Sequence, residues 1–215
     1  MLNQKVADLR KDYKLASLEE SDVAPYPLQQ FDRWWQDATS SEIDEPNAMT
    51  LATSTPEGHP SARIVLLKSF DEEGFLFFTN YESRKGQELA LNPHVSLLFF
   101  WRELERQVRI EGTVSKAGVN ISNEYYNSRP MGSRIGAIAS PQSKVIPGRS
   151  FLEEQVGQVA AKYEKEAPQR PDYWGGYVVK PVVMEFWQGR SSRLHDRILY
   201  TLTTTGSWKI ERLAP

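Results

Sequence analysis

Three apolar stretches between residues 48 and 80 are separated by only two short turns, and this spacing is the strongest constraint on the fold. The stretches cover residues 48–53, 61–70 and 75–79. The connections contain TPEG at 55–58 and DEEG at 71–74, which are typical turn sequences. Connections this short suit antiparallel neighbours, because parallel strands need long crossovers. The pattern therefore predicts an antiparallel sheet.

The rest of the chain adds both helices and strands. Apolar spacing predicts a helix over 28–36, and further helices are expected over 83–92, 122–128 and 150–165. Ser150 and Glu153 have capping-box spacing at the start of the last helix. Strands are expected over 94–101, 107–114, 176–187, 194–202 and 208–213, with a looped segment that contains a short helix over 130–149. We expect a mostly β fold with inserted helices (α+β) on an antiparallel, barrel-like sheet, with a charged arm over 1–25 and one domain over 26–215.

The composition argues against several classes of function. The formal net charge of the 215 residues is −2, whereas a nucleic-acid-binding domain is expected to be basic. The chain has no cysteine, and His59, His94 and His195 lack zinc-motif spacing, so no metal site is predicted. Neither G-x-G-x-x-G nor a P-loop occurs. No stretch resembles a signal peptide or a membrane span, so we expect a soluble, cytoplasmic protein with no membrane partner.

A cluster of positive charge near the C-terminus suggests an anionic ligand. On a strand, Arg193, His195 and Arg197 would project from one face, because side chains alternate with a period of two. They would repel one another without an anion between them, and the nearby Trp187 suggests a ligand with a flat ring. An edge strand whose charges discourage pairing with another sheet explains the same residues equally well.

A second candidate anion site lies where a strand leads into a helix. Thr79 and Ser83 supply hydroxyls, Arg84 and Lys85 supply positive charge, and the start of the helix supplies backbone amides. A capped helix with solvated charges is the simpler explanation of this segment taken alone. Weaker candidates for contacts with a heterocycle are Gln107, Gln142 and Ser143.

Two further groups of residues have the chemistry of anion binding. Arg63 and Lys68 lie in the apolar stretch 61–70, where a cation needs an anionic partner or access to water. Their spacing of five sends them to opposite faces of a regular strand, so a shared ligand requires a bulge or strong twist. Tyr125 and Arg129 lie on one side of a helix and Ser133 follows Pro130. These three residues suit a phosphorylated aromatic ligand, although a surface helix explains them more simply.

Taken together, these pieces resemble one enzyme family over nearly the full chain. The matching segments are LRKDY near the N-terminus, ARIVLLK, FFTNYESRKGQELA, SLLFFWRELERQVRIEG, YYNSRPMGSRIGA, SPQS, EFWQGRSSRLHDR and the terminal WKIERLAP. In this order they are similar to the pyridoxine/pyridoxamine 5′-phosphate oxidases, which are FMN enzymes. The resemblance implies a split β-barrel homodimer with FMN at the subunit interface.

The resemblance also implies a reaction and a set of site residues. Hydride would pass from the substrate C4′ to the flavin, O2 would reoxidise the flavin to give H2O2, and pyridoxal 5′-phosphate would be the product. Arg193 and His195 would flank the reacting carbon as catalytic residues. The implied FMN contacts are Arg63, Lys68, Phe78, Thr79, Ser83, Arg84, Lys85, Gln107, Gln142, Ser143, Trp187 and Arg197. The implied substrate contacts are Arg10, Tyr13, Lys68, Tyr125, Arg129, Ser133, Arg193 and His195, with Arg10 and Tyr13 on a segment that closes over the substrate.

Two other functions stay open at this point. A protein that binds FMN or pyridoxal phosphate without turnover would keep the phosphate contacts, but would not need Arg193 and His195. A split-barrel flavin or deazaflavin-dependent reductase would leave the phosphate set on Tyr125, Arg129 and Ser133 unexplained. The chain also departs from the family pattern at Arg134, where glutamine is expected, and at Ile138, where tryptophan is common.

Overall fold

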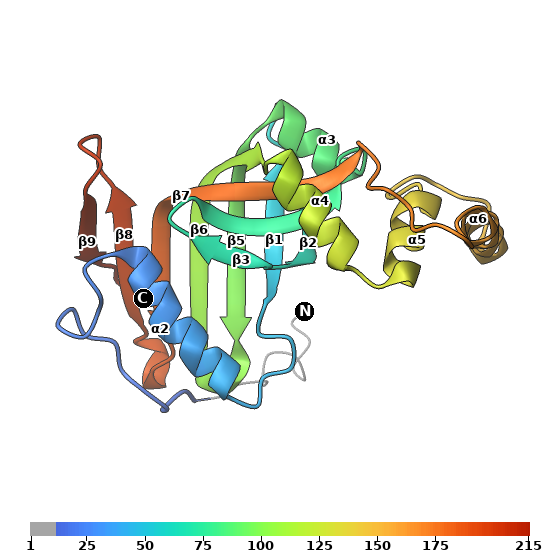
Figure 1. Ribbon diagram of the computed structural model, residues 1–215. Coiled ribbons are helices and arrows are strands. Elements are labelled where there is room, and N and C mark those ends of the chain that lie inside the picture. The colour runs from blue at the N-terminus through green and yellow to red at the C-terminus, as the bar shows by residue number, and fades with distance from the viewer. Residues whose placement is uncertain (1–11) are drawn as a thin grey trace, which may run out of the picture. The chain divides into compact units, whose positions relative to one another are not determined.

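The computed structural model describes residues 12–215, which form a mostly β fold (Figure 1). Within this range, nine strands form one sheet in the order β2-β1-β5-β6-β7-β4-β3, with β8 paired to β7 and β9 paired to β8. The strands are β1 (Ala48–Ser54), β2 (Pro60–Leu66), β3 (Ser69–Asp71), β4 (Gly74–Asn80), β5 (His94–Trp101), β6 (Arg106–Lys116), β7 (Trp174–Gln188), β8 (Asp196–Leu202) and β9 (Trp208–Arg212). The helices are α2 (Pro27–Ser40), α3 (Arg84–Leu91), α4 (Val119–Ser128), α5 (Met131–Ala139) and α6 (Arg149–Lys162), with short 3-10 helices η1 (Arg102–Leu104) and η2 (Ser191–Arg193). The pairs β3–β4, β4–β7, β7–β8 and β8–β9 are antiparallel, as predicted.

The chain forms two compact units. Of the described residues, the first comprises 12–49, 97–111 and 181–215, and the second comprises 50–96 and 112–180. Strands β1, β5, β6 and β7 each contribute residues to both units. The expected division into an arm over 1–25 and a domain over 26–215 stays a prediction.

Aromatic side chains of α2 build the core of the first unit. The helix carries Pro27 in its first turn, where the missing N–H of proline has no intrahelical partner to lose. Phe31 is fully buried, and its ring centroid lies 5.2 Å from that of Phe99 in β5. Trp34 meets Phe186 of β7 edge-on at 5.3 Å. Burial of these rings fixes α2 against its own unit.

In the second unit, β4 leads directly into α3. Strand β4 pairs with β7 from Phe75, which lies opposite Val179, to Asn80, which lies opposite Trp174. The helix then begins at Arg84, and a Cβ on residue 86 would lie 2.2 Å from the Tyr81 carbonyl oxygen. Glycine at this position therefore lets the first turn of α3 approach the preceding backbone closely.

Two expected strands and one expected helix cap differ from the structure. Residues 61–70 were expected to form one strand, but β2 ends at Leu66 and β3 begins at Ser69, where the Lys68 N–H donates to the Leu76 carbonyl at 2.8 Å. The strand expected from residue 194 begins only at Asp196, because residues 191–193 form η2. The capping box is also wrong: α6 begins at residue 149, and its N-cap, Gly148, has no side chain to cap the helix.

Candidate active site

The start of α3 brings together three of the predicted cofactor residues. Thr79 Oγ1 and Lys85 Nζ each donate a hydrogen bond to Gln142 Oε1 at 3.2 Å. Ser83 is fully buried; its hydroxyl donates to the Asn80 carbonyl at 2.6 Å and accepts from the Gly86 N–H at 3.3 Å. Ser83 thus caps α3 through its hydroxyl. Gln142, in the loop after α5, thus joins the end of β4 to the start of α3.

The electrostatics of this point favour an anion. Burial lowers the pKa of Lys85, and the nearby Arg63 lowers it further, whereas Glu88 raises it. Arg84 adds a third cation and pairs through Nε with Glu88 Oε1 at 2.9 Å. An anion bound among these groups would offset their mutual repulsion and stabilise the charged form of Lys85.

Arg63 is held in place by a buried carboxylate. Its Nη1 donates to Thr53 Oγ1 at 2.6 Å, and its Nη2 lies 3.4 Å from Glu88 Oε2. The side chain of Glu88 is 6% exposed and accepts a hydrogen bond from the Ser61 hydroxyl at 2.6 Å. Burial raises the pKa of Glu88, but hydrogen bonds from Ser61, Thr53 and Arg84 outweigh it and bring the pKa to about 2. Glu88 is therefore ionised near neutral pH and orients the guanidinium of Arg63.

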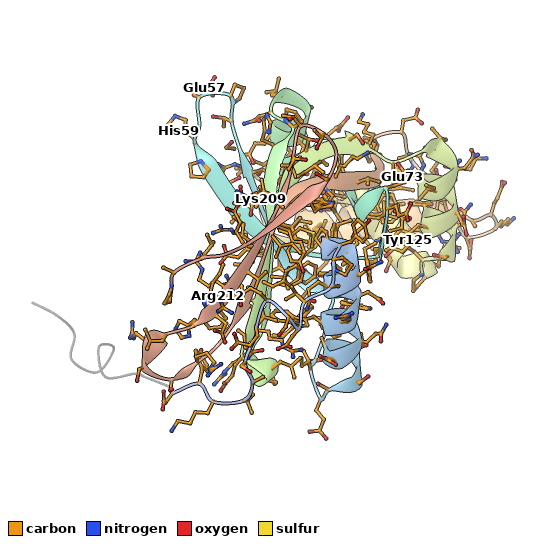
Figure 2. All side chains as sticks on the ribbon, turned by 90° about the vertical axis from the view of Figure 1, so that its left-hand side faces the viewer. Glu57, His59, Glu73, Tyr125, Lys209 and Arg212 are labelled. Atoms are coloured by element: carbon orange, nitrogen blue, oxygen red, sulfur yellow. The ribbon has the colours of Figure 1, made fainter. Side chains whose placement is uncertain are left out.

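The break after β2 changes the argument about Lys68. A regular strand would send Arg63 and Lys68 to opposite faces, but Lys68 lies beyond the end of β2. Its Nζ lies 5.7 Å from the ring centroid of Tyr125, which Figure 2 shows on α4. Strand alternation therefore does not separate the two cations. That they share one ligand stays a prediction.

A stack of aromatic rings forms one wall of the second unit. Phe78 of β4 lies 4.0 Å from Tyr125 of α4, centroid to centroid, with an interplanar angle of 18°. Trp174 of β7 continues the stack at 5.6 Å from Phe78. The guanidinium carbon of Arg129 lies 4.7 Å from the Trp174 ring centroid. Arg129 is thus packed against the stack that holds Tyr125.

Arg129 has an unsatisfied donor beside a pocket. Its Nη1 is buried and has no hydrogen-bond partner within residues 12–215, and burial lowers the pKa of the guanidinium. A buried, unpaired N–H of a cation is costly unless an anion completes it. A pocket of about 260 Å³ lies here, lined by Asn80, Arg129, Ser133, Gly136, Ala137, Ser140, Gln142 and Trp174. It thus combines two predicted substrate residues, Arg129 and Ser133, with one predicted cofactor residue, Gln142.

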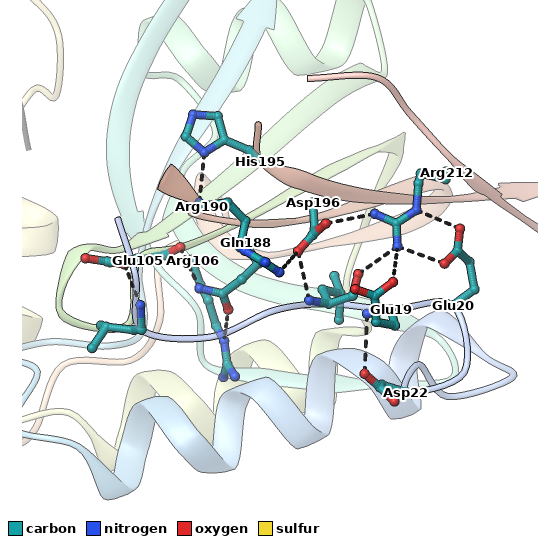
Figure 3. Close-up of polar contacts among 12 residues, drawn as sticks. Glu19, Glu20, Asp22, Glu105, Arg106, Gln188, Arg190, His195, Asp196 and Arg212 are labelled. Carbon is teal, nitrogen blue, oxygen red and sulfur yellow. Dashed lines mark hydrogen bonds and ion pairs between the residues drawn. The ribbon is translucent and has the colours of Figure 1, made fainter. Parts of the chain in front are cut away.

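A second group of predicted residues lies in the first unit. The ring centroids of Trp187 and His195 are 4.5 Å apart, and Tyr13 lies edge-on to both, at 5.8 Å from Trp187 and 6.0 Å from His195. The Arg190 backbone N–H donates to His195 Nδ1 at 3.1 Å (Figure 3). The neutral imidazole therefore carries its proton on Nε2. Burial lowers the pKa of His195, Arg193 lowers it further, and Asp196 raises it.

The three C-terminal basic residues do not share a strand face. Arg193 lies in η2 with a φ of 62° and is exposed, and His195 precedes β8, so only Arg197 lies on the strand. The expectation of a shared face is wrong because positive φ values at Ser192 and Arg193 turn the backbone before β8 begins. Arg197 Nε pairs with Glu185 Oε1 at 2.7 Å, and this bond raises the pKa of Arg197.

The remaining predicted residues are scattered or undescribed. Gln107 is half-buried on β6, and Ser143 is exposed with a φ of 69° in the loop after α5. Arg10 lies outside the described residues. Residues 12–215 contain no group of histidines and carboxylates that could hold a metal ion. No described helix is long and apolar enough to cross a membrane.

Sequence reasoning missed several residues that shape both groups. Asn80 and Trp174 line the pocket, Glu88 orients Arg63, and Asp196 accepts hydrogen bonds from Arg190 and Arg212. The signal for Trp174 was an aromatic residue at the start of a strand beside two glycines. The sequence gives no signal for the contact of Glu88 with Arg63 or of Asp196 with Arg212, because these partners lie 25 and 16 residues apart.

Comparisons with known proteins agree over the whole chain. A family model described as pyridoxamine 5′-phosphate oxidase matches residues 36–163, and one described as the pyridoxine 5′-phosphate oxidase C-terminal dimerisation region matches residues 174–215. A pyridoxine/pyridoxamine 5′-phosphate oxidase of Paraburkholderia phymatum is 61% identical over 98% of this chain and 99% of its own length. One of Trichormus variabilis is 56% identical over the full length of both.

Solved structures show the same fold. PhzG from Burkholderia lata 383, solved in complex with tetrahydrophenazine-1-carboxylic acid, matches with a TM-score of 0.88 and 31% identity over 95% of this chain and 100% of its own. An FMN-binding protein of Nostoc punctiforme, related to pyridoxamine 5′-phosphate oxidase, matches with a TM-score of 0.69 and 17% identity over 90% of this chain and 99% of its own. The fold therefore defines a protein of the split-barrel class.

Within that class, the chain belongs to the pyridoxamine 5′-phosphate oxidase family, whose members are oxidases. The resemblance read from the sequence motifs is confirmed.

Proposed function

We propose that this protein oxidises pyridoxamine 5′-phosphate and pyridoxine 5′-phosphate to pyridoxal 5′-phosphate with FMN as cofactor and O2 as electron acceptor. Membership of the oxidase family over the whole chain supports the reaction class. The observation that carries the proposal is the pocket at Arg129, where a buried guanidinium N–H has no partner within residues 12–215. It lies against an aromatic stack, so a flat ring with a phosphate suits both features.

The chain offers a chemically suitable set of groups for FMN. The start of α3 supplies amides, Lys85 and Arg84 supply charge, and Arg63 is pre-oriented by Glu88. When bound, the flavin would accept hydride from the substrate C4′ and pass two electrons to O2, giving H2O2. The proposed FMN contacts are Arg63, Lys68, Phe78, Thr79, Ser83, Arg84, Lys85, Gln107, Gln142, Ser143, Trp187 and Arg197.

The substrate phosphate would be held by Lys68, Tyr125, Arg129 and Ser133. With its proton on Nε2, neutral His195 would donate a hydrogen bond to the substrate rather than remove a proton from it. Arg193 would bring positive charge to the reacting end, and its exposed position leaves it accessible to a ligand. With the amine substrate, the imine left at C4′ would be hydrolysed to the aldehyde and ammonia. The protein would act mainly by orienting two flat rings.

We further propose a homodimer with FMN at the subunit interface. The match of residues 174–215 to a dimerisation region supports the dimer.

The proposal is tested by turnover of the purified, flavin-loaded protein. We expect O2 consumption with pyridoxamine 5′-phosphate, with H2O2 and pyridoxal 5′-phosphate formed in equal amounts. Arg129→Ala should lower kcat/KM by on the order of 100-fold, because a desolvated charge contact is lost. Arg149→Ala, which removes an exposed helix pair with Glu153, serves as the matched control and should leave kcat/KM unchanged.

Two results would contradict the proposal. Flavin binding without O2 consumption would favour a non-catalytic flavoprotein. Reduction of the flavin by a nicotinamide or deazaflavin donor, with no response to pyridoxamine 5′-phosphate, would favour a split-barrel reductase.

A further inference from the structure

One guanidinium joins the segment before α2 to the C-terminal hairpin. Arg212, near the end of β9 (Figure 2), donates to the Leu18 carbonyl at 3.0 Å and pairs with Glu19 at 3.1 Å. It also pairs with Glu20 at 2.6 Å and with Asp196 Oδ1 at 2.9 Å (Figure 3). A single exposed ion pair contributes little to the stability of a fold, but here four acceptor groups surround one guanidinium. This arrangement fixes the path of residues 18–20 along the hairpin.

Asp196 connects this contact to the candidate catalytic histidine. It is 9% exposed and accepts from the Leu18 N–H at 3.1 Å and from Arg190 Nη1 at 2.9 Å, both through Oδ2. The backbone N–H of the same Arg190 holds His195 Nδ1. Arg212, Asp196 and Arg190 thus form a continuous chain of hydrogen bonds from the N-terminal segment to His195.

The other end of the segment is held by a different carboxylate. Glu105 Oε2 accepts from the N–H groups of Lys14 and Leu15 at 2.8 and 3.1 Å. Immediately before the Glu105 attachment, Tyr13 packs against Trp187 and His195. Tyr13 also packs on Gly189, where an added Cβ would lie 2.8 Å from the Tyr13 side chain. Glycine at 189 therefore leaves the space that Tyr13 occupies.

We propose that Arg212 is a positioning residue for substrate binding: its contacts with Glu19, Glu20 and Asp196 hold Tyr13 and His195 at the substrate site. The inference rests on the proposed function for the identity of the substrate. Arg212 acts through other residues and contacts no reacting atom. Residues further along the segment have their own attachments, since Ala24 is fully buried and its carbonyl accepts from the Tyr200 hydroxyl at 2.7 Å. Loss of Arg212 should therefore loosen residues 13–20 without unfolding the first unit.

The test compares Arg212→Met and Arg212→Lys with wild type, with Arg149→Met as the control for losing an exposed ion pair. Hydrogen–deuterium exchange of the flavin-loaded protein reads the amides of Lys14, Leu15 and Leu18. We expect exchange at these amides to rise by about 10-fold in Arg212→Met, with core amides of β7 unchanged. The KM for pyridoxamine 5′-phosphate should rise about 10-fold with a smaller change in kcat, and FMN affinity should stay within about twofold. Arg212→Lys should recover part of both effects.

The outcomes separate this inference from the proposed function. Unchanged exchange in Arg212→Met, or faster exchange with an unchanged KM, would overturn the positioning role. A uniform rise in exchange across β7 would show a merely structural role and would also overturn it. If wild type shows no turnover, the proposed function fails. The same variants are then compared by their dissociation constants for pyridoxal 5′-phosphate, measured by tryptophan fluorescence, in place of KM.

Discussion

At the residue scale, the protonation of His195 connects geometry to chemistry. The N–H of Arg190 occupies Nδ1, and burial and the charge of Arg193 lower the pKa of the imidazole below its ordinary 6.5. In the charged imidazolium, the proton on Nδ1 would face the Arg190 N–H, so the hydrogen bond between them would be lost. His195 should therefore be neutral near pH 7, with Nε2–H as the donor.

This argument predicts a titration. An NMR titration of the protein should place the pKa of His195 below 6.5, and Arg193→Ala should raise it by removing a neighbouring positive charge. Because the folded-state value lies below the unfolded one, the stabilisation from neutral His195 is fully present above pH 6.5. It is lost as the pH falls from there through the folded pKa. A pKa at or above 6.5, or a fall in Arg193→Ala, would show that this environment is misjudged.

Glu88 gives a second prediction at this scale. Its folded pKa of about 2 lies below the ordinary 4.5, so the ionised carboxylate stabilises the fold above pH 4.5, and this stabilisation is lost as the pH falls toward 2. Glu88→Gln should lower the free energy of unfolding at pH 7 by about 2–3 kcal/mol, because a buried partner of Arg63 is removed. Urea unfolding at pH 7 and pH 3 measures the difference, which should shrink at the lower pH.

The matched control for Glu88 is Glu153→Gln, which changes an exposed carboxylate paired with Arg149 on α6. It should alter the free energy of unfolding by less than about 0.5 kcal/mol. An equal loss in both variants would mean that the buried cluster has no special role.

At the scale of elements, the start of α3 should tolerate no side chain at residue 86. A Cβ there would lie 2.2 Å from the Tyr81 carbonyl oxygen, whereas at Gly157, inside α6, no atom lies within 4 Å. Gly86→Ala should therefore shift the first turn of α3 and weaken FMN binding, whereas Gly157→Ala should raise the free energy of unfolding by about 0.5–1 kcal/mol. Calorimetry and flavin titration of both variants measure the effects. A gain in stability from Gly86→Ala would contradict the close approach described here.

The elements also show what sequence patterns can and cannot reveal. Strand β5 and helix α3, with Ser83 as its N-cap, follow the expected bounds because alternation, proline and capping residues are local signals. The break at Lys68 and the late start of β8 were missed, because the first depends on pairing with Leu76 and the second on positive φ at Ser192 and Arg193. Apolar residues on both sides of Lys68 imitate a continuous strand, and Leu194 imitates an earlier start of β8.

The candidate site divides in the same way. Thr79, Lys85 and Gln142 could be proposed from residue types and a resemblance, and the structure brings them together. Glu88 and Asp196 could not, since a carboxylate looks like any surface charge until the fold buries it beside an arginine. Motifs therefore predict the groups that face a ligand better than the groups that hold them in place.

At the scale of the whole molecule, we expect a homodimer whose assembly is coupled to FMN binding. Residues 174–215 match a dimerisation region, and β8 and β9 lie within it. Sedimentation equilibrium should give a mass of twice the 24.6 kDa chain. A monomer that retains flavin at high dilution would contradict a cofactor site formed at the subunit interface.

The visible spectrum under anaerobic conditions tests whether paired anion pockets hold FMN and a phosphorylated vitamer for hydride transfer. Addition of pyridoxamine 5′-phosphate to the flavin-loaded protein should bleach the oxidised flavin band, and admission of O2 should restore it with formation of H2O2. Pyridoxamine without its phosphate should bleach the band far less at equal concentration, because the contact with Arg129 is absent. A band that persists with the phosphorylated substrate, or that bleaches equally with both compounds, would contradict the account.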